Sequence, residues 1–131
     1  MAGTFKFELV TPERMALSQD ATQVVVPGLE GDFAVLAGHA PVISALRPGI
    51  IVVTLPDASR TRIFVKGGFA EVDPQHLTVL AERALDVEAM DAGTIAAELA
   101  AAEAELAAAA DDTARLAATS ALAQLRGLQR G

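Results

Sequence analysis

The sequence predicts an α+β fold, with an N-terminal antiparallel β-sandwich of about ten short strands before a C-terminal antiparallel hairpin of two helices. Two observations support this. All five Phe and all six Pro lie at or before Pro74, whereas more than a third of the residues after Ala84 are alanine. Short apolar runs bounded by turn residues also give way to apolar residues at helical spacing. We therefore predict a sandwich domain over residues 1–85 and a helical domain over residues 86–131.

The first expected strand, TFKFELV, alternates in the manner of a half-buried strand, with Phe5, Phe7 and Leu9 on one face. The other expected strands are TQVVVPG, FAVLA, VISAL, GIIVVTL, RTRIFV, FAEV and LTVLAE. The pair Gly67 and Gly68 predicts a hairpin turn, because such turns need positive φ, and LPDASR predicts another. A parallel α/β sheet needs crossover helices, and no helical periodicity occurs before residue 86, so a sandwich or flattened barrel is favoured.

The C-terminal half predicts two helices that meet along apolar stripes. We expect the packing residues to be Ile95, Leu99 and Leu106 of the first helix and Leu116, Leu122 and Leu125 of the second. Asp111 or Asp112 would cap the second helix. Glu98, Glu103 and Glu105 lie off the stripe, on a face expected to be solvated. Because alanine buries little apolar area, the pair should be held loosely and be able to leave its docking site.

Composition excludes several classes of function. The net charge of -7 argues against nucleic-acid binding and against attachment to anionic lipid. The absence of cysteine excludes thiolate metal sites and thiol nucleophiles. The first twenty residues lack the apolar run of a signal peptide, and Arg47, Pro48 and Gly49 interrupt the most apolar window, so no direct membrane insertion is expected.

No catalytic constellation is evident, and we expect no cofactor, no metal and no enzymatic activity in this chain. Walker A, GxGxxG and HExxH motifs are absent. His39 with Asp32, or His76 with Asp73, could form half of a metal or acid–base site; for His76 a solvated turn is favoured. The glycines of residues 28–49 favour backbone turns over a phosphate site, because strands rather than a helix N-terminus follow them.

One long stretch, GLEGDFAVLAGHAPVISALRPG, carries a gapped pattern that is far more specific than any short motif. Its matching positions are Gly28, Gly31, Asp32, Val35, Leu36, Gly38, His39, Ala40, Pro41, Leu46, Arg47, Pro48 and Gly49. With VKGGFAEV, LTVLAERA and ALAQLR, the chain resembles the epsilon subunit of bacterial F-type ATP synthases, the counterpart of the mitochondrial delta subunit. The resemblance implies a non-catalytic subunit of the central stalk that couples proton-driven rotation of the c ring to ATP synthesis on other chains.

The resemblance also implies partners and contact residues. Glu30, Gly31, Asp32 and His39 would contact the c ring, with Asp32 accepting from its polar or basic groups. Ala40, Pro41 and Val42 would contact the gamma subunit. The hairpin, if extended, would reach the catalytic alpha and beta subunits. The protein would lie peripherally on the cytoplasmic face of the bacterial inner membrane, within the F1 sector.

Some members of this family bind ATP through the motif Ile/Leu-Asp-x-x-Arg-Ala. The matching stretch keeps Asp91 between Met90 and Ile95, but Thr94 replaces the arginine that would fork onto phosphate. Arg126 could supply a charge from the second helix. The helical half holds eight acidic and three basic residues, so we expect weak inhibition of ATP hydrolysis. Two other hypotheses are a small-ligand or nucleotide-binding sandwich module and a metal-dependent enzyme built on His39 and Asp32.

Overall fold

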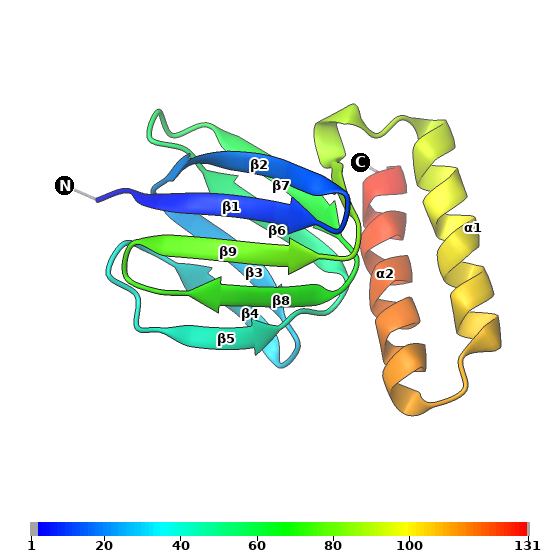
Figure 1. Ribbon diagram of the computed structural model, residues 1–131. Coiled ribbons are helices and arrows are strands. Elements are labelled where there is room, and N and C mark those ends of the chain that lie inside the picture. The colour runs from blue at the N-terminus through cyan, green and yellow to red at the C-terminus, as the bar shows by residue number, and fades with distance from the viewer. Residues whose placement is uncertain (1–2, 131) are drawn as a thin grey trace.

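Within residues 3–130, which this computed structural model describes, ten strands form two five-stranded sheets and two helices follow them (Figure 1). The first sheet has the order β2-β1-β9-β8-β5, with bounds Arg14–Ala21, Phe5–Thr11, His76–Ala81, Gly68–Val72 and Val42–Ala45. The second has the order β10-β7-β6-β3-β4, with bounds Ala84–Asp86, Arg60–Val65, Gly49–Thr54, Gln23–Gly28 and Gly31–Val35. A short 3-10 helix, η1 (Val87–Ala89), leads to α1 (Ala92–Ala108) and α2 (Asp112–Arg130).

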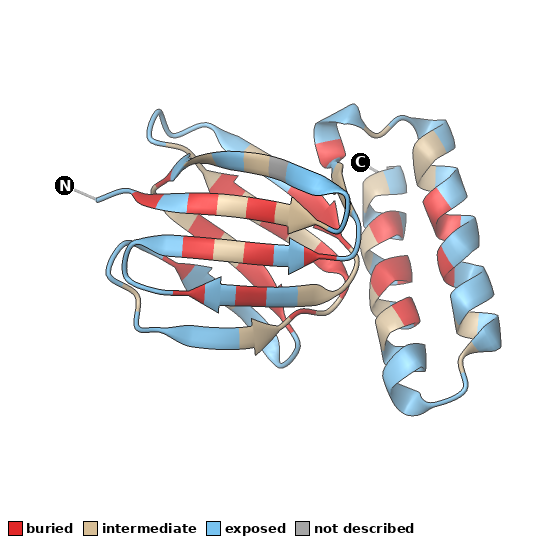
Figure 2. Cartoon of the chain, in the orientation of Figure 1, coloured by how far each residue is buried: buried red, intermediate tan, exposed pale blue. Residues whose placement is uncertain are grey.

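The sandwich predicted from the sequence is confirmed, and its core lies between the two sheets. Phe5, Phe7 and Leu9 of β1 point into the core, while Lys6 and Glu8 point outward. A similar alternation of buried residues with less buried ones is visible along β8 and β9 (Figure 2). Within the described chain, neither helix has the length and apolarity that a bilayer span requires.

Three features of the sheets differ from the expectation. β1 pairs with β9 in parallel, which a purely antiparallel sandwich does not include. β2 was not expected, because a polar residue, Gln19, sits in register with core residue Phe7 and a shift between Leu9 and Val10 disturbs the alternation. β10 was not expected either, because its three residues are too few to show an alternating pattern.

The prediction of a hairpin turn at Gly67 and Gly68 is wrong. β7 belongs to one sheet and β8 to the other, so these glycines form a corner where the chain crosses the sandwich. Gly68 has a φ of +116°, and a Cβ there would lie 1.9 Å from the carbonyl oxygen of Leu80. A corner therefore places the same demand on glycine as a hairpin does. The predicted turn at LPDASR does join two paired strands, β6 and β7.

The helical hairpin packs at one end of the sandwich, against outward-facing residues of the second sheet, with α2 next to the sandwich and α1 beyond it (Figure 1). Phe64 of β7 points away from the sandwich core and is completely buried beneath the helices. The buried residues of this second cluster are Phe64, Val87, Leu99, Ala102, Ala121, Leu122 and Leu125, with Ile50, Leu85, Met90, Ile95, Leu106 and Leu128 partly buried around them. Asp111 caps α2 by accepting from the amide of Ala114 at 2.8 Å.

Two expectations for the hairpin are wrong. Leu116 is 65% exposed and does not pack between the helices. It precedes buried Ala118 by two residues, about 200° around a helix of 3.6 residues per turn, so it lies on the opposite face. Alanines make up much of the buried stripe of α2, and the spacing of its leucines was therefore misleading. Glu98 is buried rather than solvated, because it pairs with Arg83 of the sandwich.

Candidate functional site

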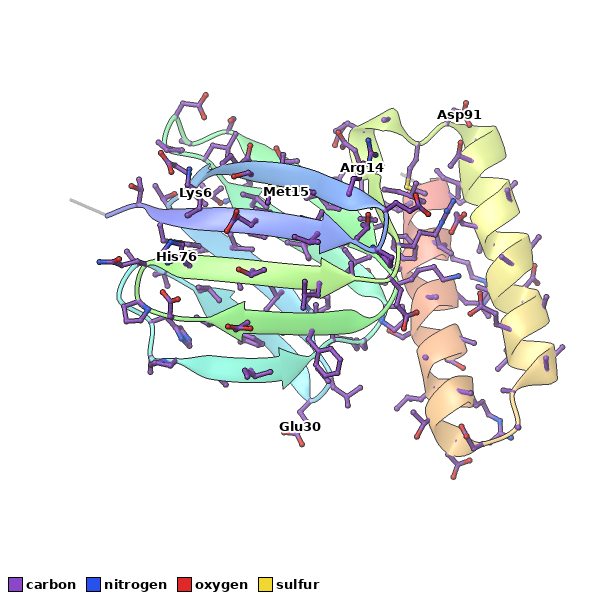
Figure 3. All side chains as sticks on the ribbon, in the orientation of Figure 1. Lys6, Arg14, Met15, Glu30, His76 and Asp91 are labelled. Carbon is purple, nitrogen blue, oxygen red and sulfur yellow. The ribbon has the colours of Figure 1, made fainter. Side chains whose placement is uncertain are left out.

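The turn between β3 and β4 projects from one edge of the sandwich. Gly28 and Gly31 face each other across it, and Leu29 and Glu30 form its exposed tip (Figure 3). A Cβ at Gly28 would lie 2.5 Å from the carbonyl oxygen of Gly31. Only glycine allows the two arms of the turn to approach this closely.

Arg47 donates hydrogen bonds to both arms of this turn. Its Nη1 donates to the carbonyl oxygen of Gly28, and its Nη2 donates to Asp32 Oδ1 at 2.5 Å. Its backbone amide donates to the carbonyl oxygen of Pro27 at 3.0 Å. One guanidinium therefore bridges both arms of the turn, as its planar fork allows. Asp32, expected to be a free acceptor, already has a partner within the chain.

The loop of residues 36–41 is also fixed. The amide of Gly38 donates to the carbonyl oxygen of Pro74 at 2.8 Å, which ties the loop to the connection between β8 and β9. His39 Nδ1 lies 2.7 Å from the carbonyl oxygen of Ala40, and its ring centroid lies 6.4 Å from that of Phe33. The His39 ring is therefore held by contacts with its own loop and with Phe33 of β4. Asp32 pairs with Arg47 and not with His39.

The turn and the loop line one open cleft of about 570 Å³ between β4 and β5. These strands are the last of their sheets, and the turn after β3 joins them at one end, where the amide of Leu29 donates to the carbonyl oxygen of Ala45 at 2.9 Å. The cleft is lined by Gly28, Leu29, Glu30, Gly31, Phe33, His39, Ala40, Pro41, Val42, Ile43, Ser44 and Ala45. Six of the seven predicted contact residues meet here, and only Asp32 lies outside the lining.

A second surface, which sequence reasoning missed, lies on the outer face of the first sheet. In the register of the strands, one row of side chains crosses all five and is entirely apolar: Met15, Val10, Leu80, Phe69 and Ala45. We call this set the apolar row. Met15, Phe69 and Leu80 are about half exposed. Alternation shows which residues of a strand point outward, but the row appears only once the order of the strands is known.

The neighbouring row on this face carries two acidic residues, and we call it the acidic row. It contains Ser18, Glu8, Thr78, Glu71 and the highly exposed Ile43 of β5. Neither glutamate forms an ion pair with any residue in the described part of the chain. The outer face of the first sheet therefore offers an apolar strip beside uncompensated negative charge.

The remaining candidates lie far from the cleft. Asp91 sits at the start of α1, across the molecule from Glu30 (Figure 3). It caps the helix by accepting from the amide of Thr94 at 2.7 Å, and this hydrogen bond lowers the pKa of its carboxyl group. Met90 and Ile95 pack in the cluster beneath the hairpin, and Arg126 lies exposed on α2. The degenerate ATP motif is thus used as a helix start.

The second histidine also has a local role. His76 is exposed at the start of β9, with its Nδ1 3.4 Å from Asp73 Oδ1 (Figure 3). The backbone amide of Gln75 is the main cause of a lowered pKa for Asp73, so this carboxylate organises the turn. Among residues 3–130, no three His, Asp or Glu side chains are grouped so that they could hold a metal ion.

Comparison with known proteins agrees with this architecture. Residues 4–87 match the family described as "ATP synthase, Delta/Epsilon chain, beta-sandwich domain". The chain is 48% identical over 129 residues to the ATP synthase epsilon chain of Parvibaculum lavamentivorans, which covers 98% of both proteins. It is 50% identical over 104 residues to ATP synthase epsilon chain 1 of Nitrobacter hamburgensis, 79% of this chain and 76% of the relative.

Two solved structures share the fold. A chain of the Euglena gracilis mitochondrial ATP synthase assembly of OSCP, F1 and c-ring aligns with a TM-score of 0.73 at 24% identity, covering 97% of this chain and 80% of that chain. A chain of the Tetrahymena thermophila mitochondrial ATP synthase central stalk and c-ring aligns with a TM-score of 0.56 at 16% identity, covering 92% and 98%. At these identities the alignments show a common fold.

Proposed function

The chain belongs to the ATP synthase delta/epsilon chain family, and from this premise we propose that it is a non-catalytic rotor subunit that couples c-ring rotation to ATP synthesis. Its curated relatives are named ATP synthase epsilon chains. We further propose that it lies peripherally at the cytoplasmic face of a bacterial inner membrane, in the F1 sector. It would approach the membrane sector only through the c ring.

The apolar row is the observation that carries this proposal, since it gives the chain a docking face on a rigid body. Exposed apolar patches of this kind are uncommon on proteins that act alone and commonly mark interaction sites. We assign the row to the gamma subunit. The acidic row beside it favours a partner with an apolar strip next to basic side chains. Ala40, Pro41 and Val42 would extend this contact around the edge of β5, where Ile43 joins the two surfaces.

We assign the tip of the cleft to the c ring. Glu30 lies at the exposed tip of the turn with Gly31 next to it, and Arg47 donates hydrogen bonds to both arms of that turn. A joint that transmits torque needs surfaces of fixed shape, and both the turn and the loop of residues 36–41 are tied to the sandwich by hydrogen bonds. Asp32 and His39 would support this contact from beneath the tip.

The gamma assignment is tested by placing a charge in the apolar row. In sedimentation with purified gamma, Phe69→Arg should weaken the complex by about thirtyfold, the effect expected at the centre of an interface. Leu116→Arg is the matched control, because Leu116 is similarly exposed but lies on the hairpin. Unchanged binding of both Phe69→Arg and Leu80→Arg would refute the assignment to gamma, and the absence of any complex with gamma would refute the proposed function.

The c-ring assignment needs a different variant. Glu30→Arg should leave binding to gamma intact but weaken attachment of the gamma complex to c rings, measured by co-sedimentation with membranes stripped of F1. Glu30 is a better probe than Asp32, because replacing Asp32 also removes the partner of Arg47. If Glu30→Arg attaches normally and supports normal ATP-driven proton pumping, the tip of the turn does not contact the c ring.

We also propose that the hairpin inhibits ATP hydrolysis weakly. The helical half holds eight acidic and three basic residues, which makes it a poor ligand for an acidic segment of a catalytic subunit. The test compares the full chain with one ending at Met90, which keeps β10 intact, in hydrolysis assays with the purified catalytic sector. Similar activity with both chains is expected. Strong suppression by the full chain alone would show that the hairpin is an effective inhibitor.

A further inference from the structure

Two carboxylates of α1 form ion pairs with the sandwich: Glu98 is buried, and Glu105 remains half exposed. Glu98 and Glu105 are seven residues apart, about two helical turns, so they lie on the same side of the helix. Ala102 lies between them and is completely buried. Glu98 accepts two hydrogen bonds from Arg83, at 2.9 and 3.3 Å, and Glu105 accepts one from Lys66 Nζ at 2.6 Å.

The two basic partners come from one corner of the sandwich. Lys66 follows β7 and Arg83 precedes β10, and the amide of Lys66 donates to the carbonyl oxygen of Arg83 at 3.0 Å. Two adjacent cations thus engage two consecutive carboxylates on one face of α1. The acidic character of the helix, which has no use in the proposed docking surfaces, is complementary to this corner.

Burial makes these pairs different from ordinary surface ion pairs. The side chain of Glu98 is 10% exposed and that of Lys66 is 18% exposed, while their partners remain about half exposed. Breaking either pair would leave a largely buried charge without a partner, which costs more than the loss of an exposed pair. The Arg62–Glu88 pair, at 3.0 Å, joins β7 to η1 with both side chains well exposed.

The hairpin and the sandwich also meet through a hydrogen bond and an apolar cluster. Ser120 Oγ donates to the carbonyl oxygen of Pro48 at 2.7 Å. In that cluster Phe64 lies beneath leucines and alanines of the helices: Leu99, Ala102, Ala121, Leu122 and Leu125. Because the alanines contribute little apolar burial, charge pairing adds to what the leucines supply in holding the hairpin in place.

We propose that the pairs Arg83–Glu98 and Lys66–Glu105 form an ion-pair latch that holds the helical hairpin against the sandwich. Breaking the latch releases the hairpin from the second sheet while the sandwich stays folded. This inference does not rest on the proposed function, because release is a property of the isolated chain. It gives the excess of acidic residues in the hairpin a structural role.

The latch is tested by measuring the distance between hairpin and sandwich. The chain has no cysteine, so spin labels or fluorophores can be attached at Gln75→Cys, in an exposed turn, and Ala110→Cys, at the exposed end of the hairpin. Arg83→Ala should increase the released fraction about tenfold, as expected for loss of a charged hydrogen bond. Arg83→Glu should increase it further by placing like charges together. Arg62→Ala, which breaks the exposed pair, is the matched control and should have no effect.

Salt distinguishes an ionic latch from a loss of packing. Raising KCl from about 0.05 M to about 1 M shortens the Debye length to about 3 Å and should increase release of the unmodified chain. The double variant Arg83→Ala/Lys66→Ala should be released at low salt and respond little to KCl. The proposal is overturned if this double variant remains docked, if release of the unmodified chain is independent of salt, or if Arg62→Ala releases the hairpin equally.

Discussion

The sandwich and the hairpin are stabilised in different ways, although they share one chain. The sandwich core consists of large side chains from both sheets, including Phe7, Leu9, Ile51 and Leu77, all buried almost completely. The helices bury leucines and alanines around one outward-facing phenylalanine of β7 and add ion pairs at their border. The comparison teaches that one chain can combine a core of large apolar side chains with an attached element that depends on smaller side chains and on charge.

The largest effect should come from emptying the sandwich core. Phe7→Ala removes a fully buried ring and should lower the free energy of unfolding by about 3–5 kcal/mol. Because the helices dock on the sandwich, they should lose their position together with it. Denaturant unfolding followed by far-ultraviolet circular dichroism measures the loss. A stable sandwich in this variant would show that the two regions differ less than their cores suggest.

A comparable truncation in the hairpin should have a smaller and more local effect. Leu125→Ala removes a fully buried side chain of α2, and the cost should be near the lower end of the usual range, about 2 kcal/mol, because the helices can resettle. Amide hydrogen exchange should show faster exchange in α1 and α2 and unchanged protection in the β-strands. Equal loss of protection in both regions would mean that hairpin and sandwich unfold as one unit.

The same contrast explains how much the sequence could predict. In the sandwich, strands such as β1 alternate large apolar and charged residues, so their position and buried face follow from the sequence. In the hairpin, alanine carries little information about which face is buried, and Leu116 was placed on the wrong one. The sequence predicts a solvated Glu98 because its partner, Arg83, lies outside the helix, in the connection between β9 and β10.

The docking surfaces show a related limit. The stretch of residues 28–49 identified most of the cleft, since its residues are close in sequence and its turns need particular residue types. The apolar row combines one residue from each of five strands, including β2, which the sequence did not reveal. Such a surface depends on strand order and register, and neither follows from local patterns alone.

The contacts of Arg47 with the turn between β3 and β4 provide a test within the sandwich. Arg47→Ala removes the side-chain hydrogen bonds to Gly28 and Asp32 and should cost about 1 kcal/mol of stability, because the pair is partly exposed. Arg47→Lys should restore the charge but not the fork, and so should recover only part of this loss. Thermal unfolding gives the stability, and amide chemical shifts of Gly28 and Gly31 report the turn. Unchanged shifts in both variants would show that the backbone alone fixes the turn.

The smallest effect concerns the start of α1 and its response to pH. The amide of Thr94 donates to Asp91 and lowers the pKa of that carboxyl group in the folded protein. The ionised cap therefore stabilises the helix above the unfolded pKa of about 3.9, and this contribution is lost as the pH falls through the lower folded value. Asp91→Asn keeps a capping oxygen without a titrating group. The first turn of α1 should therefore keep the same amide protection from about pH 7 to about pH 3. Asp91→Ala should weaken protection at every pH. If the unmodified chain and Asp91→Asn lose protection equally as the pH falls, titration of the Asp91 cap does not cause the fraying of α1.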